Sequence, residues 1–109
     1  MKVKILLILL SSKTTSFLKK DGEIPYLYAY KDDDIEKIIK KIYDEYVNYT
    51  YEWVDISLSG CYINNDTVYI VFRSFVDVSD VIQSNCDWQK ITEVKDEFIS
   101  KLVQKAAIY

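Results

Sequence analysis

The chain of 109 residues lacks histidine altogether, and it has no large excess of charge of either sign. Without an imidazole, any acid–base catalysis or metal binding has to rely on carboxylates, lysines and tyrosines. The formal net charge of −3, from 14 basic and 17 acidic residues, provides no positive field for phosphate backbones or anionic lipid. The composition excludes histidine chemistry and gives no support to bulk nucleic-acid binding or to a membrane partner.

Cysteine is nearly absent as well, since only Cys61 and Cys86 are present, and neither has metal-ligand spacing around it. Two reduced, partly buried thiols in a cytosolic protein are the usual interpretation of such a pair. We therefore expect a cytoplasmic protein without a disulfide, although spacing alone leaves a bridge between the two open.

Long apolar runs are missing too. The uninterrupted run Ile5–Leu10 has six residues, whereas a membrane-spanning helix needs roughly 20. The residues after it, 11–13, do not form the small-residue cleavage site of a signal peptide. Residues 3–10 are instead predicted to be a strand buried on both faces, in the middle of a mixed or parallel sheet.

What the chain does contain is a strongly amphipathic segment over residues 32–48. Its apolar residues recur at helical spacing, and they are Ile35, Ile38, Ile39, Ile42 and Tyr46. The charged residues fall together on the opposite side of a helical wheel, and they are Asp34, Lys37, Lys41, Asp44 and Glu45. Aspartates at 32–34 suit a helix start, where unpaired N–H groups favour negative charge. This pattern predicts a helix packed on a sheet, with one charged strip where any chemistry would lie.

An Asp-Gly turn predicts a β-hairpin before this helix, with residues 14–19 and 24–30 as its two arms. In the second arm Tyr26, Tyr28 and Tyr30 alternate with aliphatic residues, so one face of the strand is entirely tyrosine. Two interpretations stay open. The tyrosines are either the polar side of a strand at a sheet edge or an aromatic platform for a base or ring.

The remaining segments predict further strands and one more helix. Residues 49–58 are typical of a strand that continues or kinks through 59–63, and a turn at 64–66 leads into a second strand at 67–76. A loop at 77–87 and a short edge strand at 88–91 follow, and a helix starts near Thr92. We therefore expect one α/β domain over residues 1–109, a mixed α+β sheet with helices packed on its faces.

This order of segments resembles the Nudix fold family, whose signature is G-x5-E-x7-R-E-U-x-E-E-x-G-U, where U is a bulky aliphatic residue. In this chain the signature places its first glycine on Tyr26, directly after Pro25, and its first glutamate on Asp32. The R-E-U, E-E and G-U groups then fall on Lys40-Lys41-Ile42, Asp44-Glu45 and Val47-Asn48. The resemblance covers nearly the whole chain in outline. It implies an α/β/α sandwich with a central mixed sheet, one box-like helix and a C-terminal helix.

The signature is degenerate here. Outside the aliphatic position only Glu45 is identical, both glycines are replaced, and Lys41 stands where the family has a metal-binding glutamate. In the family these glutamates bind a divalent metal ion that polarises a diphosphate. The resemblance implies that Lys41 points at Glu45 and takes the place of the ion. It leaves no cofactor, or an Mg²⁺ or Mn²⁺ ion bound weakly by Asp32, Asp44 and Glu45.

Three hypotheses follow. The first is a Nudix-like domain that has lost hydrolysis and acts as a binding or interaction module. Its ligand would be a protein partner, a nucleotide or a diphosphate, and its contact surface would be the tyrosine arm and the 77–87 loop. The second is a divergent Mg/Mn-dependent hydrolase of nucleoside diphosphate derivatives that uses Asp44 and Glu45 as catalytic residues, with Glu93 or Glu97 as a base. The third is a small α/β subunit of a larger assembly.

The candidate ligand-binding residues are Tyr26, Tyr28 and Arg73, the last as a clamp for phosphate. The charged strip also has a simpler interpretation, a solvated helix face with weak surface pairs. The lysine-, isoleucine- and asparagine-rich usage is typical of an AT-rich genome, such as that of a phage or virus or a reduced bacterium.

Overall fold

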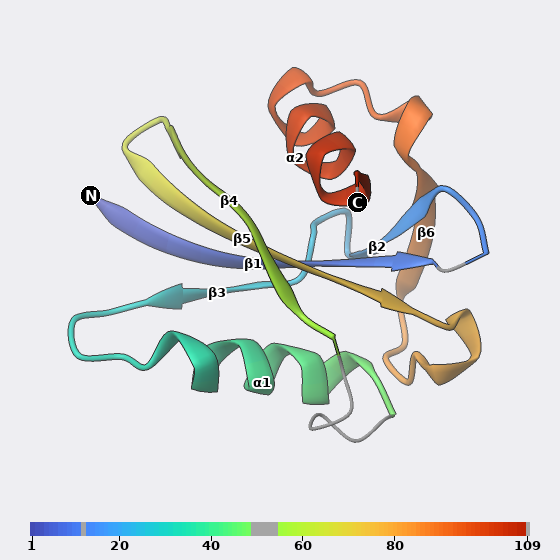
Figure 1. Cartoon of the computed structure of the whole chain (residues 1–109), viewed down its shortest axis with the longest axis horizontal. Helices are drawn as coiled ribbons and strands as arrows, with labels where there is room; N and C mark the ends of the chain where they lie inside the picture. The colour runs from blue at the N-terminus through green and yellow to red at the C-terminus, as the bar shows by residue number, and fades with distance from the viewer. Residues whose placement is uncertain (12, 49–54, 109) are drawn as a thin grey trace.

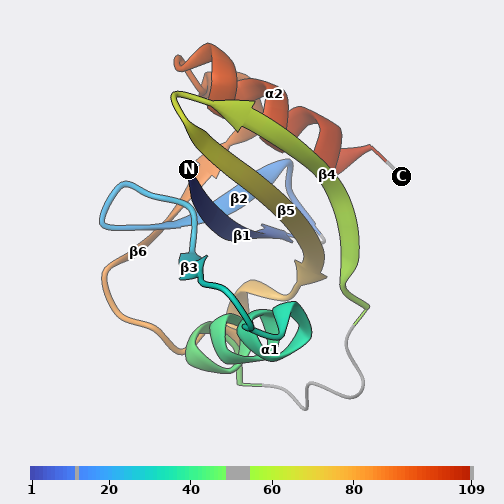
Figure 2. The ribbon, with the colours of Figure 1, turned by 90° about the vertical axis from the view of Figure 1, so that its left-hand side faces the viewer.

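A six-stranded mixed sheet lies between two helices, one on each face (Figures 1 and 2). The structure is a computed structural model and describes residues 1–11, 13–48 and 55–108. The strands are β1 Lys2–Ser11, β2 Ser16–Lys20, β3 Tyr26–Ala29, β4 Ser57–Asn64, β5 Thr67–Val76 and β6 Cys86–Lys90, and the helices are α1 Ile35–Tyr46 and α2 Glu97–Ala107. Within these described ranges, no helix is both long and apolar enough to cross a membrane.

β1 is the central strand, as the sequence predicts. The sheet order is β4-β5-β1-β2-β6, and β3 also pairs with β1. β1 runs parallel to β5 from Lys2↔Thr67 to Ser11↔Val76, and antiparallel to β3 and β2 on its other side. A strand with partners on both edges and helices on both faces has no side in contact with water, which explains its continuous apolar run.

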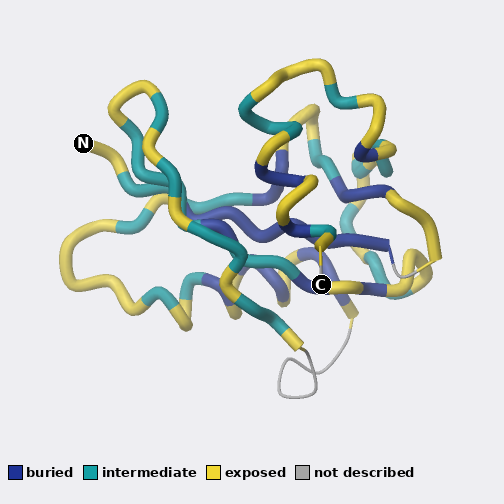
Figure 3. Tube along the Cα trace, turned by 45° about the horizontal axis from the view of Figure 1, so that its top comes forward, coloured by how far each residue is buried: buried dark blue, intermediate teal, exposed yellow. Residues whose placement is uncertain are grey.

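The alternation of side chains along β1 divides the interior into two cores, which Figure 3 shows as the dark blue centre of the trace. The α1 side contains Ile5, Leu7, Leu9, Ile39, Ile42 and Tyr43. The α2 side contains Leu6, Ile8, Leu10, Leu102, Val103 and Ala106. Each helix therefore packs its apolar stripe on one half of the side chains of the same strand.

α1 is shorter than the predicted segment by three residues at its start and two at its end. Asp34 is the N-cap, and its side chain accepts a hydrogen bond from the Glu36 N–H at 3.0 Å. Asp33 accepts one from the Tyr30 N–H at 2.7 Å. The aspartates thus form the entry turn of the helix rather than its first turn.

The predicted hairpin is wrong beyond its turn. Lys20 and Glu23 exchange two backbone hydrogen bonds, and Asp21 and Gly22 adopt φ values of 52° and 82°, which suits a tight Asp-Gly turn. After the turn, however, the chain pairs with β1 and not with β2. The reason is that both edges of β2 are already occupied, by β1 and β6.

The strands that follow the α1 helix agree with the prediction except near their ends, since the described residues 55–56 were predicted as strand and are not in one. Residues 49–54 of the first predicted strand lie outside the described residues, and β4 begins at Ser57 with an irregularity between Leu58 and Gly60. The turn is confirmed by the left-handed backbone of Asn65 and Asp66, with φ of 50° and 62°. β5 has the predicted bounds, and β6 is an edge strand that begins two residues early.

The C-terminal helix begins later than its predicted start near Thr92. Residues Ile91–Glu93 form a turn of 3₁₀ helix, and α2 starts at Glu97. Its N-cap is Asp96, which accepts a hydrogen bond from the Ile99 N–H at 3.0 Å. Aspartate is a stronger N-cap than threonine, so Asp96 rather than Thr92 sets the start of the helix.

Ile39 tests the packing of α1. Its side chain is 2% exposed in the core beneath β1, so Ile39→Asp places an unpaired charge there. We expect this variant to unfold, because the total stability of such a domain is about 5–15 kcal/mol. The measurement is thermal or urea unfolding by circular dichroism, with the exposed Lys37→Asp as the control. A cooperative transition close to that of the parent would contradict the burial of this face.

Cys61 and Cys86 are both free thiols. They lie on β4 and β6, the two outer strands of the sheet order, which are four strand spacings or about 19 Å apart. A disulfide requires Cα atoms within about 7 Å, so we expect no intramolecular bridge even under oxidation. Mass spectrometry of the monomer without reductant should show both thiols, and a loss of two hydrogens would contradict this arrangement of strands.

Candidate functional site

The exposed face of α1 carries the residues that the resemblance places in the metal site. Lys37, Lys41, Asp44 and Glu45 are all exposed on it. The ion pair on this face is Lys40–Asp44, with Nζ and Oδ2 2.6 Å apart. Both side chains are about half exposed, so the pair contributes only a few tenths of a kcal/mol to stability. Lys41 and Glu45 were expected to face each other, but in the described part of the chain they form no ion pair.

Glu45 has a different partner, which sequence reasoning missed. Its Oε1 accepts a hydrogen bond from Gln83 Nε2 at 3.4 Å, and Gln83 Oε1 accepts one from Lys20 Nζ at 3.1 Å. These three residues come from α1, the loop before β6 and the end of β2. No local pattern connects them, because the β2–β6 pair and the backbone contacts of residues 80–82 with the end of α1 bring the three segments together.

These residues do not fit a divalent metal ion. Asp32 precedes the N-cap of α1 and Glu45 lies in its last turn, about 15 Å along the helix axis, so one ion cannot contact both. Asp44 is paired with an ammonium group. Among residues 1–11, 13–48 and 55–108, no group of three acidic or cysteine side chains is placed to hold a metal. The candidates Asp32, Asp44 and Glu45 are therefore not brought together.

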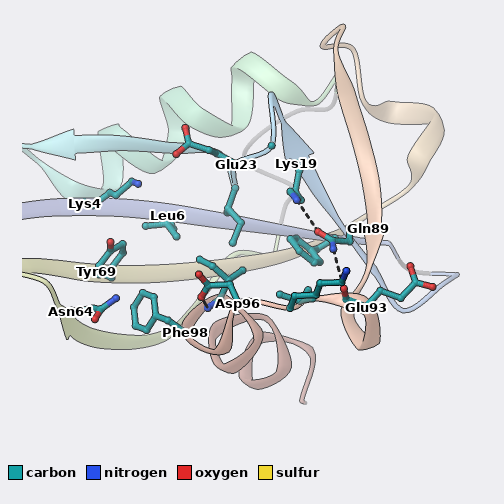
Figure 4. A pocket seen from close by; sticks show the side chains of 16 residues that line it. Lys4, Leu6, Lys19, Glu23, Asn64, Tyr69, Gln89, Glu93, Asp96 and Phe98 are labelled. Atoms are coloured by element: carbon teal, nitrogen blue, oxygen red, sulfur yellow. Dashed lines mark hydrogen bonds between the residues drawn. The ribbon is translucent and has the colours of Figure 1, made fainter.

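A cavity of about 610 Å³ lies on the other face of the sheet, against the start of α2 (Figure 4). Its walls come from β1, β2, β5, β6, the turn before β3 and the first residues of α2. The charged residues in its lining are Lys4, Lys19, Lys95, Glu23, Glu93 and Asp96. Its aromatic residues are Phe17, Tyr69 and Phe98. A concave site that combines apolar walls with a few polar groups is typical of small-molecule binding.

Lys4 connects this cavity to the tyrosine arm. In the sheet register Lys4 is the partner of Tyr28 on β3 and of Tyr69 on β5. Its Nζ lies 3.9 Å from the centroid of the Tyr26 ring, a cation–π distance. The structure thus brings Tyr26 and Tyr28 next to the cavity lining. Sequence reasoning missed Lys4 and Tyr69, because strand pairing alone brings these distant positions together.

Two pairs of aromatic rings lie near Lys4, one on the tyrosine arm and one between β5 and α2. Tyr26 and Tyr28 meet edge to face, with ring centroids 5.6 Å apart, and Tyr69 meets Phe98 in the same way at 4.9 Å. The Glu23 carboxylate, together with partial burial, raises the pKa of the Tyr26 phenol. Lys4 lies between the two ring pairs, 3.9 Å from the Tyr26 centroid and 5.8 Å from the Tyr69 centroid.

Arg73 lies outside this site. Its guanidinium Nη1 donates a hydrogen bond to the carbonyl oxygen of Ala106 at 3.1 Å, near the C-terminal end of α2. A cation at this end complements the helix dipole, so the arginine attaches α2 to β5 rather than lining the cavity. Of the two proposed bases, Glu93 lines the cavity and Glu97 does not. Glu93 is on the α2 side of the sheet, opposite Asp44 and Glu45.

The predicted contact surface is also divided. Tyr30, 74% exposed, precedes the first turn of α1, whereas Val78 and Ile82, 48% and 58% exposed, follow its last turn. Figure 1 shows the two groups near opposite ends of the helix. The tyrosine arm and the 77–87 loop therefore do not form one continuous apolar patch.

Tyr46, next to Glu45, predicts a pH effect on stability. Burial, with a smaller contribution from the Glu45 carboxylate, raises the pKa of Tyr46 from 10.0 to about 12. The neutral phenol therefore stabilises the fold fully below pH 10, and this contribution is lost as the pH rises from 10 to 12. We expect the urea midpoint of the parent to fall more steeply over this range than that of Tyr46→Phe. Parallel curves would show that Tyr46 titrates normally.

Comparison with known proteins identifies the fold. No family model matches the sequence, and no curated protein matches it either. Solved structures match over nearly the whole chain. An E. coli dihydroneopterin triphosphate pyrophosphohydrolase has a TM-score of 0.70 at 9% identity, covering 94% of this chain and 92% of that one. A mutT/nudix family protein from Listeria innocua has a TM-score of 0.70 at 11% sequence identity, and the match covers 96% of this chain and 90% of that one. A C. elegans Ap4A hydrolase has a TM-score of 0.67 at 15% sequence identity, and the match covers 96% of this chain and 95% of that one. The chain has the Nudix fold.

Proposed function

We propose that this chain is a binding module on the Nudix fold that does not hydrolyse diphosphates. The observation that supports this most directly is the lysine at position 41, within the α1 face that would have to supply metal ligands. Metal-assisted cleavage of a diphosphate requires cations held at the reacting oxygens by carboxylates in a fixed geometry. Here one ligand position carries an ammonium group, and Asp44 is paired with Lys40.

The interactions of Glu45 favour the same conclusion. Its carboxylate is bonded to the Gln83 amide, and that amide is bonded to Lys20. Lys20 also lies 5.8 Å from the centroid of the Tyr46 ring. The end of α1 thus has its own network of amide, ammonium and phenol groups. The Glu45 carboxylate thus has a hydrogen-bond partner within the protein itself.

The cavity on the α2 side supports a role in binding. It combines aromatic rings with an amide and both signs of charge, and it lies on the face opposite the α1 strip. Two solved structures with this fold are named for dihydroneopterin triphosphate and for Ap4A. A nucleotide, or a related ligand that carries a ring, is the chemistry that we propose for this cavity.

A protein partner is the second candidate, supported by the outer strand β4. Ser57–Asn64 contains no charged residue, and its Leu58 and Ile63 side chains are 57% and 72% exposed. Edge strands of proteins that do not pair with others usually carry charges or prolines. An uncharged edge with exposed apolar residues favours contact with another protein.

The substitution Lys41→Glu tests the degenerate metal site. The unmodified chain should show little Mg²⁺- or Mn²⁺-dependent cleavage of nucleoside diphosphate derivatives, for the reasons given above. Lys41→Glu removes the cation and places a carboxylate one helical turn before Glu45, so Mn²⁺ affinity should rise detectably. Turnover is not expected, because neither signature glycine is present. The measurements are a phosphate-release assay and a paramagnetic Mn²⁺ titration.

Lys37→Glu is the matched control, since it makes the same charge change one turn further from Glu45 on the same exposed face. A rise in Mn²⁺ affinity for Lys41→Glu but not for Lys37→Glu would support the degenerate site. Equal affinities would favour a merely solvated face. Metal-dependent turnover by the unmodified chain would identify a divergent hydrolase and overturn the proposal.

A further inference from the structure

We propose that the cavity binds an uncharged planar ring, as in a free nucleobase or nucleoside, and gains no affinity from phosphate groups. This inference rests on the proposed binding function and concerns the same cavity. It is carried by the charges in the lining and by the partners those charges already have.

The lining has no net charge. Lys4, Lys19 and Lys95 are balanced by Glu23, Glu93 and Asp96. A diphosphate carries two or three negative charges, and a balanced lining provides no potential to offset the loss of their hydration. A ring without charge loses much less hydration when it enters such a cavity.

Two of the three lysines are already engaged. The ammonium of Lys4 lies 3.9 Å from the centroid of the Tyr26 ring, and the Tyr28 and Tyr69 rings are further away, at 6.0 and 5.8 Å. Lys19 Nζ donates to Gln89 Oε1 at 2.8 Å, and Gln89 Nε2 donates to the Glu93 carbonyl at 3.4 Å. Part of the charge and hydrogen-bonding capacity of both cations is therefore already used within the protein, which weakens what either can offer to a phosphate.

The start of α2 is blocked as well. The N-terminus of an 11-residue helix attracts anions, because its first N–H groups lack partners in the helix. Here the Asp96 carboxylate occupies that position through its bond with the Ile99 N–H. An incoming phosphate would meet this negative charge, with that of Glu93 also in the lining.

The groups that remain suit a ring. Tyr69 and Phe98 offer aromatic surface, and Leu6, Phe17 and Ile24 offer apolar walls. The Asn64 amide, also in the lining, makes no side-chain hydrogen bond within the described part of the chain, so it can donate to and accept from a ring edge. Stacking and one amide are enough to recognise a base without reading its phosphates.

The test compares adenosine, guanosine, cytidine and uridine with their 5′-mono- and diphosphates by calorimetry or ligand-observed NMR, in EDTA. We expect saturable binding of at least one nucleoside. The Kd of its 5′-diphosphate should lie within about threefold of the Kd of the nucleoside itself. We also expect the diphosphate Kd to change less than about twofold between 50 and 300 mM salt, because no ion pair with the ligand is involved.

Glu23→Lys adds the missing positive charge. Glu23 is exposed at the cavity mouth and its side chain makes no hydrogen bond in the described structure, so the fold should tolerate the change. The variant changes the local charge by two units, from negative to positive. We therefore expect the affinity for the diphosphate, relative to that for the nucleoside, to rise at least about threefold. Glu36→Lys makes the same charge change on the α1 side, so it should leave the ratio of diphosphate to nucleoside affinity unaltered.

The outcomes separate this inference from the proposed function. A diphosphate that binds the unmodified chain about tenfold or more tightly than its nucleoside would overturn the inference while leaving a non-hydrolytic module. Absence of binding by every nucleoside and nucleotide would overturn it too, and would favour the protein partner. Metal-dependent cleavage would overturn the proposed function, whichever ligand binds more tightly.

Discussion

The burial of β1 on both faces is the constraint on which the rest of this structure depends. Ile5–Leu10 is almost fully excluded from water, with no side chain more than 3% exposed. Such a strand requires a helix on each face, because its apolar side chains must be covered from water. It also requires a partner strand on each edge, because its buried N–H and C=O groups need hydrogen bonds. α1, α2, β5 and the pair β2 and β3 meet these four requirements. The two faces remain chemically separate because side chains alternate along the strand.

The same alternation explains why a cavity forms at one end of the strand. Lys4 is on the same face of β1 as Leu6 and Ile8, but the helix that covers this face reaches the cavity only with its first residues, Phe98 and Ile99. The start of β1 therefore has a polar residue on the α2 side and aromatic neighbours on β3 and β5 in the same register. The cavity therefore lies where the sheet extends past the first turn of α2.

Periodicity predicted those features that depend on neighbouring residues. The apolar spacing of α1, the buried run of β1 and the Asn-Asp turn before β5 are all local signals, and the structure confirms each of them. The partner of β3 could not be predicted in this way. The Asp-Gly turn is genuine, but β6, about 70 residues further along, occupies the edge of β2 that a hairpin would need.

The candidate site was predictable only in part for the same reason. The tyrosine arm is a local pattern, so Tyr26 and Tyr28 could be found. Lys4 and Tyr69 become neighbours only when the parallel pair β1 and β5 forms, and Asp96 joins them only when α2 packs on the sheet. The charged face of α1 shows a finer limit, since helical spacing permits both Lys40–Asp44 and Lys41–Glu45, and the structure forms the first.

The separation of the two faces also bears on how a Nudix fold could lose hydrolysis and keep binding. Lys41, Asp44 and Glu45, which align with the signature, are exposed on α1, where a substitution costs little stability. The cavity residues belong to the α2 side, and they share no side-chain packing with that strip. Substitutions more than about 7–10 Å apart with no shared partner act almost independently. A substitution at position 41 can therefore change the charge pattern of the α1 face without disturbing Tyr69, Phe98 or Asn64, so in this architecture the two faces can change independently.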